Sequence, residues 1–176
     1  GHGLPESLVV KQKPEWLYCL DDGKAPAPIR HFGAPGVVPV CMAGQYHNDI
    51  LAIVKEIVDS YDVDAVYLDG PYHGWIFTDT ICQCPSCKKK FKDASGFDLP
   101  SNADLKSKKL DPDFMKIYSV YLDWVTEILV KTAKEIRTIV NSKGGRKLPL
   151  LFNGCSAEYL KDCHQQEMIA QFDGFL

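Results

Sequence analysis

The stretch from residue 36 to residue 70 constrains the fold of this chain more than any other. A short apolar run, GVVPVC, precedes YHNDILAIVKEIVDSY, in which apolar residues recur at the spacing of an amphipathic helix. The β-branched run VDAVYLDG follows almost at once. A strand, a helix and a strand joined by short links form a βαβ unit, in which the two strands are parallel. The sequence therefore predicts a parallel sheet.

The same alternation continues to the last residue. A short helix is expected at CPSCKKKFKDAS, and a long one from Asp111 to NSKGG, with Pro112 at its first position. KLPLLFNG is then a predicted strand, AEYLKDCHQQEMIA a helix and FDGFL a further strand, and SLVVK is a candidate fifth strand. Alternation of this kind is typical of α/β proteins with a doubly wound sheet or a closed barrel. Because a (β/α)8 barrel takes about 250 residues, we expect a portion of such a TIM barrel, truncated or open.

Length and composition indicate one α/β domain over residues 1–176, since the chain is 45% hydrophobic and long enough to bury a core. Residues 1–36 are expected to form a surface loop region, because prolines are dense there. A net charge of −3 offers no basic field for nucleic acid. The longest apolar stretch, residues 118–130, is interrupted by Asp123 and Glu127. We therefore expect neither nucleic acid nor a membrane as a partner, and homo-oligomerisation stays open.

Three of the seven cysteines lie in CQCPSC, as Cys82, Cys84 and Cys87. Thiolates at this spacing supply three ligands of a tetrahedral zinc site, and a structural site needs a fourth. Cys41 is favoured, because it ends the strand before the one that ends at Asp69, and neighbouring parallel strands end at the same edge. Other candidates for the fourth ligand are His73, Asp79, Cys19, Cys155 and Cys163. The alternatives are buried free thiols or an iron–sulfur cluster.

Four thiolates would close the coordination sphere, so the expected role of zinc is structural: it would pin a loop insertion at residues 70–100. Thiolate ligation is typical of a reducing compartment. It favours a cytoplasmic location, and the periplasm and the exterior stay open.

Asp69 is a candidate catalytic residue, because ligands of parallel α/β folds bind at the carboxyl ends of strands. The loop after Asp69 is rich in aromatic rings, which stack on the apolar faces of sugars. Candidate sugar-positioning residues are Tyr72, His73, Trp75, Asn153 and Trp16. The competing roles are a turn at Asp69-Gly70 and loop packing for the rings. Turn, surface or capping roles are expected for Asp173, His2, His31, His47 and His164.

Three segments together resemble a known family: PEWLYCLDDGK, VCMAGQYHNDILAIVKEIVDSYDVDAVYLDGP and CQCPSCKKKFKDASGFDLP. They are similar to the middle of the barrel of family 42 β-galactosidases and related hypothetical glycosyl hydrolases. The resemblance implies a structural zinc bound by Cys41, Cys82, Cys84 and Cys87, with Asp69 near the place of a catalytic acid. One departure is Leu68-Asp69-Gly70, where that family carries an Asn-Glu pair. This stretch is closer to the W-x-D-G setting of the nucleophile in α-L-fucosidases.

The leading hypothesis is a glycoside hydrolase domain with structural zinc, acting on galactoside- or fucoside-like sugars. Asp69 would be its general acid or nucleophile. The second carboxylate that glycosidases require is expected beyond Leu176. The rival hypotheses are a non-catalytic carbohydrate-binding or degenerate barrel domain and a zinc-stabilised interaction module.

Overall fold

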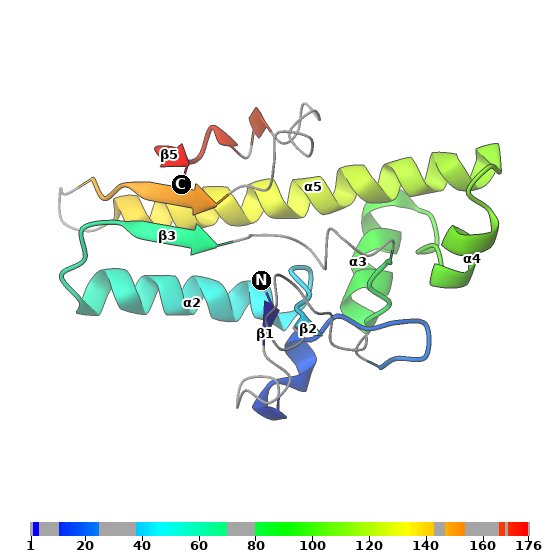
Figure 1. Cartoon of the computed structure of the whole chain (residues 1–176), viewed down its shortest axis with the longest axis horizontal. Helices are drawn as coiled ribbons and strands as arrows, with labels where there is room; N and C mark the ends of the chain where they lie inside the picture. Colours follow the sequence, from blue (N-terminus) through cyan, green and yellow to red (C-terminus); the bar gives the residue numbers. More distant parts are fainter. Residues whose placement is uncertain are drawn as a thin grey trace, which may run out of the picture. The chain divides into compact units, whose positions relative to one another are not determined.

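The structure of the chain is a computed structural model that describes residues 2–3, 11–24, 38–69, 80–142, 147–153, 166–167 and 169–175. Its elements in chain order are β1 (His2–Gly3), η1 (Pro14–Trp16), β2 (Val38–Pro39), α2 (Gln45–Ser60), β3 (Val66–Asp69), α3 (Pro85–Ser95), α4 (Asn102–Ser107), α5 (Pro112–Asn141), β4 (Leu150–Asn153) and β5 (Gly174–Phe175) (Figure 1). No helix in the described ranges is long and apolar enough to cross a membrane.

The chain divides into two compact units. The first unit comprises Gly1–Tyr46 with Tyr72–Val125, and the second comprises His47–Pro71 with Thr126–Leu176. Helices α2 and α5 each contribute to both units. The prediction of a single domain over residues 1–176 stays a prediction.

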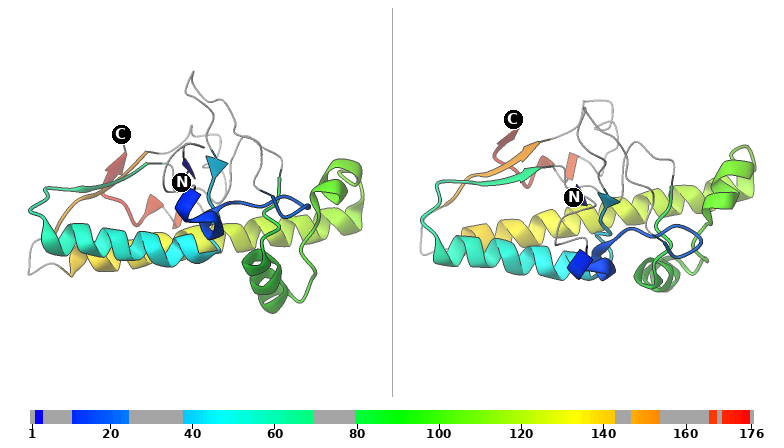
Figure 2. Two further views of the ribbon diagram at one scale, coloured as in Figure 1. Left: turned by 90° about the horizontal axis from the view of Figure 1, so that it is seen from below. Right: turned by 60° about the horizontal axis from the view of Figure 1, so that its bottom comes forward.

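The second unit contains a three-stranded parallel sheet in the order β3-β4-β5. Val66 pairs with Leu150 at one end of the β3–β4 ladder and Asp69 with Asn153 at the other. Helix α2 and the C-terminal half of α5 lie on one face of this sheet (Figure 2). The predicted parallel sheet and α/β alternation are thus found here, and the barrel stays a prediction.

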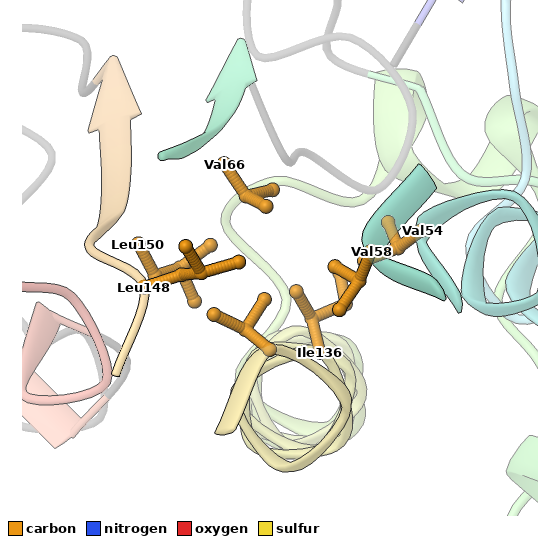
Figure 3. Packing of buried hydrophobic residues seen from close by; sticks show 7 residues of the cluster. Val54, Val58, Val66, Ile136, Leu148 and Leu150 are labelled. Carbon is orange, nitrogen blue, oxygen red and sulfur yellow. The ribbon is translucent and has the colours of Figure 1, made fainter. Parts of the chain in front are cut away.

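The core of the second unit fills the space between these helices and the strands (Figure 3). Its buried members are Val54, Val58, Val66, Ile136, Val140, Leu148 and Leu150. Val54 and Val58 lie four residues apart on α2 and share its inner stripe. Ile53 and Ile57 lie on the adjacent stripe and are 40% and 38% exposed. The apolar helix pattern predicted from the sequence therefore separates into a buried stripe and a partly exposed one.

Replacing Val58 by alanine is expected to lower the free energy of unfolding by about 2 kcal/mol, because its side chain is fully buried in this core. The neighbouring Ile57→Ala change is the matched control and should cost less than about 1 kcal/mol. Urea unfolding of both variants measures the difference. Equal losses at the two positions would contradict the assignment of the inner stripe.

Asp173 anchors the start of β5. Its Oδ2 accepts a hydrogen bond from the Leu150 amide at 2.8 Å and lies 2.9 Å from an Arg137 guanidinium nitrogen. The Asp173 amide in turn donates to the Leu150 carbonyl. The hydrogen bond from Leu150, followed by those from Arg137, holds the pKa of this carboxyl below its usual value. Asp173 thus ties β4 and α5 to β5, which is a larger role than the turn predicted from the sequence.

The segment around β2 differs from its prediction. The sequence predicts that the apolar run at residues 36–41 lies parallel beside the strand that ends at Asp69. Instead, β2 pairs antiparallel with β1, and Val40 forms an antiparallel bridge with Leu17. Pro39 has no amide hydrogen to donate, which confines such a strand to the edge of a sheet.

The first unit packs α3 against the N-terminal half of α5. Phe91 of α3 is fully buried and makes edge-to-face contacts with Tyr121 and Trp124. Helix α3 ends at Ser95 and is followed by Gly96, whose φ of 76° suits glycine at a helix C-terminus. Helix α5 begins at Pro112 after Asp111, as predicted: Oδ1 of Asp111 accepts from the amides of Asp113 and Phe114.

Candidate functional site

Four cysteine sulfurs converge in the first unit. The Sγ atoms of Cys41, Cys82, Cys84 and Cys87 all lie within 4.8 Å of one another. Cys41 Sγ is 3.4 Å from that of Cys87 and 3.6 Å from that of Cys84. Zn–S bonds of 2.3 Å in a tetrahedron place the sulfurs about 3.8 Å apart. The spacing therefore fits a tetrahedral ion bound by four sulfurs.

Local structure fixes the position of each sulfur. Cys84 is the N-cap of α3, and its Sγ accepts a hydrogen bond from the Cys87 amide three residues later. The C-x-x-C spacing therefore places both side chains at the first turn of the helix. Cys41 begins a tight turn that Gly44 closes: the Gly44 amide donates a hydrogen bond to the Cys41 carbonyl. Lys90 of α3 donates to the Ala43 carbonyl at 2.7 Å and ties this turn to the helix.

The cluster is buried and its protonation states are unequal. Cys41, Cys82 and Cys87 are fully buried, and Cys84 is 9% exposed. The hydrogen bond from Cys41, followed by those from Cys82 and Cys87, holds the pKa of Cys84 well below its usual value. The same hydrogen bonding raises the pKa of Cys87 and that of Cys41. A bound cation would stabilise the thiolate form of all four cysteines.

A fifth cysteine, Cys19, lies beside the cluster. Its amide donates to Cys82 Sγ at 3.5 Å, and its carbonyl accepts from the Gln83 amide at 2.7 Å. Its side chain is partly exposed. Burial, followed by the charges of Cys82, Cys84 and Asp22, raises the pKa of Cys19 to about 11, so this side chain is a thiol at neutral pH.

The segment that leads into the cysteine motif is held on two sides. On one side, the Tyr18 hydroxyl donates to the Thr80 carbonyl at 2.5 Å. On the other, Asn102 binds both backbone groups of Ile81: its Oδ1 accepts from the Ile81 amide at 2.6 Å, and its Nδ2 donates to the carbonyl at 3.0 Å. Asp21 accepts from the Asn102 amide and Nδ2. Asn102 thus pairs with this segment as a neighbouring strand would.

Asn102→Ala is expected to destabilise the protein by about 2–4 kcal/mol, because it leaves two buried backbone groups of Ile81 without these partners. The control is Ser107→Ala on the same helix, whose exposed hydroxyl donates to the Ala103 carbonyl within one turn. Thermal unfolding followed by circular dichroism compares the two variants. A similar shift in both would contradict the proposed anchoring of the segment.

Asp69 and Asn153 occupy the carboxyl ends of neighbouring strands. They are Cα partners in the last register pair of β3 and β4, so their backbones lie opposite each other at one edge of the sheet. The other predicted sugar-site residues of this edge, Tyr72, His73 and Trp75, lie outside the described residues, as do Asp79, Cys155 and Cys163.

Trp16 packs within the first unit. Its ring is 8% exposed and meets the Tyr46 ring edge-on at 5.1 Å between centroids. The Lys13 ammonium lies 5.7 Å from the Trp16 ring centre. This environment agrees with the packing role that the sequence also allowed, and it leaves little of the ring surface for a sugar.

His47 links two helices of the second unit, a role that its sequence position did not suggest. Its Nε2 is 2.8 Å from Glu135 Oε2, and its Nδ1 is 3.0 Å from the Thr132 hydroxyl. That hydroxyl donates to the Ile128 carbonyl, so it accepts from Nδ1. Thr132 and Glu135 lie three residues apart on α5, so their side chains lie on one face of that helix. This spacing is the sequence signal that they could share a partner.

The chain matches no protein-family model and no curated protein sequence. Its fold is similar to part of the solved structure of α-L-fucosidase isoenzyme 2 from Paenibacillus thiaminolyticus, with a TM-score of 0.51 and 22% sequence identity. The likeness covers 83% of this chain and 18% of that protein. At this identity the likeness concerns the fold alone: this chain is folded like a portion of a glycosidase.

Proposed function

We propose that Cys41, Cys82, Cys84 and Cys87 hold a structural zinc ion. The convergence of four buried sulfurs at tetrahedral spacing supports this proposal. Because four thiolates leave no open position for water, the ion would supply no chemistry. It would instead fix the turn at Cys41 to the start of α3, and with it the carboxyl-terminal part of the predicted insertion at residues 70–100.

We infer that the chain is a glycoside hydrolase domain and forms part of a (β/α)8 barrel. The observation that carries this inference is the register of Asp69 and Asn153, which sets an acid and an amide at adjoining strand ends. The fold likeness to an α-L-fucosidase supports it. Asp69 would act as general acid or nucleophile. Asn153 would hydrogen-bond a sugar hydroxyl, and Tyr72, His73 and Trp75 would line the sugar site, whereas Trp16 is assigned to packing within the first unit.

Two sugar classes fit the sequence: one fits the stretch around Asp69, and the other fits the order of the cysteines. Leu68-Asp69-Gly70 resembles the nucleophile setting of α-L-fucosidases, and the fold likeness is to one of these enzymes. The order of the four cysteines resembles that of family 42 β-galactosidases. A fucoside-like substrate is therefore proposed first and a galactoside second.

A non-catalytic carbohydrate-binding domain is the second candidate function. Among the described ends of β3, β4 and β5, Asp69 is the carboxylate at the carboxyl edge, and Asp173 lies at the opposite edge. A glycosidase needs a second carboxylate about 5–10 Å from the first. A domain that lacks one would bind a sugar without cleaving it.

The test is turnover of an aryl α-L-fucoside and an aryl β-D-galactoside by the complete protein, together with calorimetric titration of the free sugars. Cleavage of either glycoside would support the enzymatic proposal. Sugar binding without cleavage would favour the binding domain. The absence of both cleavage and binding would contradict both carbohydrate functions.

A further inference from the structure

One sulfur of the metal centre is nearer to solvent than the other three. Cys84 is 9% exposed, whereas Cys41, Cys82 and Cys87 are fully buried. Cys84 is the N-cap of α3, and the exposed Pro85 follows it at the start of the helix. An oxidant that approaches the cluster from solvent therefore meets Cys84 first. So small an exposed area favours a small oxidant such as hydrogen peroxide over a bulky disulfide.

Cys41 is placed to supply the second sulfur of a disulfide. Its Sγ lies 3.6 Å from that of Cys84, in a buried contact between residues 43 positions apart. A disulfide bond measures about 2.0 Å, so the two sulfurs would need to approach each other by roughly 1.6 Å. The hydrogen bond from Lys90 of α3 to the Ala43 carbonyl holds the turn at Cys41 beside the helix. Cys41 also lies 3.4 Å from Cys87, but neither sulfur of that pair is exposed.

We propose that the metal centre is a redox switch: hydrogen peroxide oxidises Cys84, and Cys41 then forms a disulfide with it and the ion leaves. The inference rests on the proposed metal site. In the first step the O–O bond breaks, one oxygen joins the Cys84 sulfur as a sulfenic acid, and the other takes up a proton and leaves as water. In the second step the Cys41 thiolate attacks that sulfur, the S–O bond breaks, and the oxygen takes up a proton and leaves as water.

The net change is balanced. Two thiolates, one hydrogen peroxide and two protons become one disulfide and two waters, so the peroxide is reduced and the two sulfurs are oxidised. Cys82 and Cys87 remain as ligands, and two thiolates do not complete the four-coordinate site that structural zinc requires.

The disulfide would take over the structural role of the ion. It would join the turn at Cys41 to the N-terminus of α3 by a covalent bond, so the fold should survive the release of the ion. A small thiol would reduce the disulfide by thiol–disulfide exchange and restore all four thiolates. The switch is therefore reversible.

The test exposes the zinc-loaded full chain to hydrogen peroxide in the presence of a chromogenic zinc chelator. We expect one zinc ion to be released for each pair of thiols lost, and peptide mapping by mass spectrometry to find Cys41 joined to Cys84. Dithiothreitol followed by zinc should restore the loaded protein. The control is Cys19→Ser, which removes a partly exposed thiol that is not one of the four ligands and should release its ion at the wild-type rate.

Three results would overturn the inference and leave the metal site standing. The first is an ion retained while peroxide oxidises Cys19, and the second is a disulfide other than Cys41–Cys84 in the protein that has lost its ion. The third is slower release from Cys19→Ser, because it would make Cys19 the first sulfur to react. Failure of the reduced wild type to bind zinc would overturn both proposals. The disulfide map is made on the wild type, so it does not depend on a variant that folds.

Discussion

Asparagine in place of Asp69 is expected to lower kcat/KM of the complete protein for its glycoside by about 10²–10⁴-fold. The amide keeps the size of the side chain but neither donates the proton nor attacks the anomeric carbon. Because Asp69 ends β3 and its backbone remains paired with β4, the fold should persist. Steady-state kinetics with an aryl glycoside measures the loss, and thermal unfolding verifies the fold.

Asp98→Asn is the matched control for this variant. Its carboxylate is 93% exposed and pairs with Lys92 on the surface, so the same charge change should leave kcat/KM unaffected. Full activity of Asp69→Asn would refute the catalytic assignment. A variant that binds the sugar but does not cleave it would support the assignment.

Removal of the metal is expected to lower the melting temperature by at least about 10 °C. Structural zinc sites in small peptides contribute about 10–16 kcal/mol of binding free energy, and one kcal/mol corresponds to about 2–4 °C in a chain of this length. Without a cation, the hydrogen bonds between the buried sulfurs, such as those of Cys41 with Cys84 and Cys87, are weak. Calorimetry before and after chelation measures the shift, and metal analysis should find one zinc per chain beforehand.

The fluorescence of Trp124 reports the effect of metal removal on α3 itself. Its ring is buried and lies 5.5 Å from that of Phe91 on α3, the helix that carries Cys87. Loosening of α3 on chelation should therefore change the tryptophan emission, and added zinc should restore it. A purified protein that contains no metal and melts at the same temperature with or without zinc would rule out a structural ion.

Much of the fold could be predicted because its determinants are local. The α3 and α5 boundaries follow from Gly96 and from Asp111-Pro112, which act within one turn of the chain. The strands β3 and β4 are short apolar runs between turn residues, and their parallel pairing follows from the helices between them. The cysteines Cys82, Cys84 and Cys87 signal their proximity through spacing alone.

The remaining features depend on contacts between distant residues. Nothing near Asn102 in the sequence indicates that its amide would pair with Ile81, because the pairing depends on where α4 packs. The same holds for the antiparallel setting of β2. For His47, the sequence indicates that Thr132 and Glu135 share a face of α5 but not that His47 of α2 contacts it. The prediction of Cys41 as the fourth sulfur depends on adjacent parallel strands, whereas Cys41 follows β2, which pairs antiparallel with β1.

Cys84 has two structural roles, and together they affect how readily the start of α3 unwinds and is cleaved by proteases. Its sulfur is both a member of the cluster and the N-cap of α3. The first turn of α3 therefore cannot unwind while a cation occupies the cluster, so its amide protons should exchange slowly and the peptide bonds there should resist proteases. Occupancy of the centre by metal would, by this linkage, lower the rate at which the start of α3 opens and is cleaved.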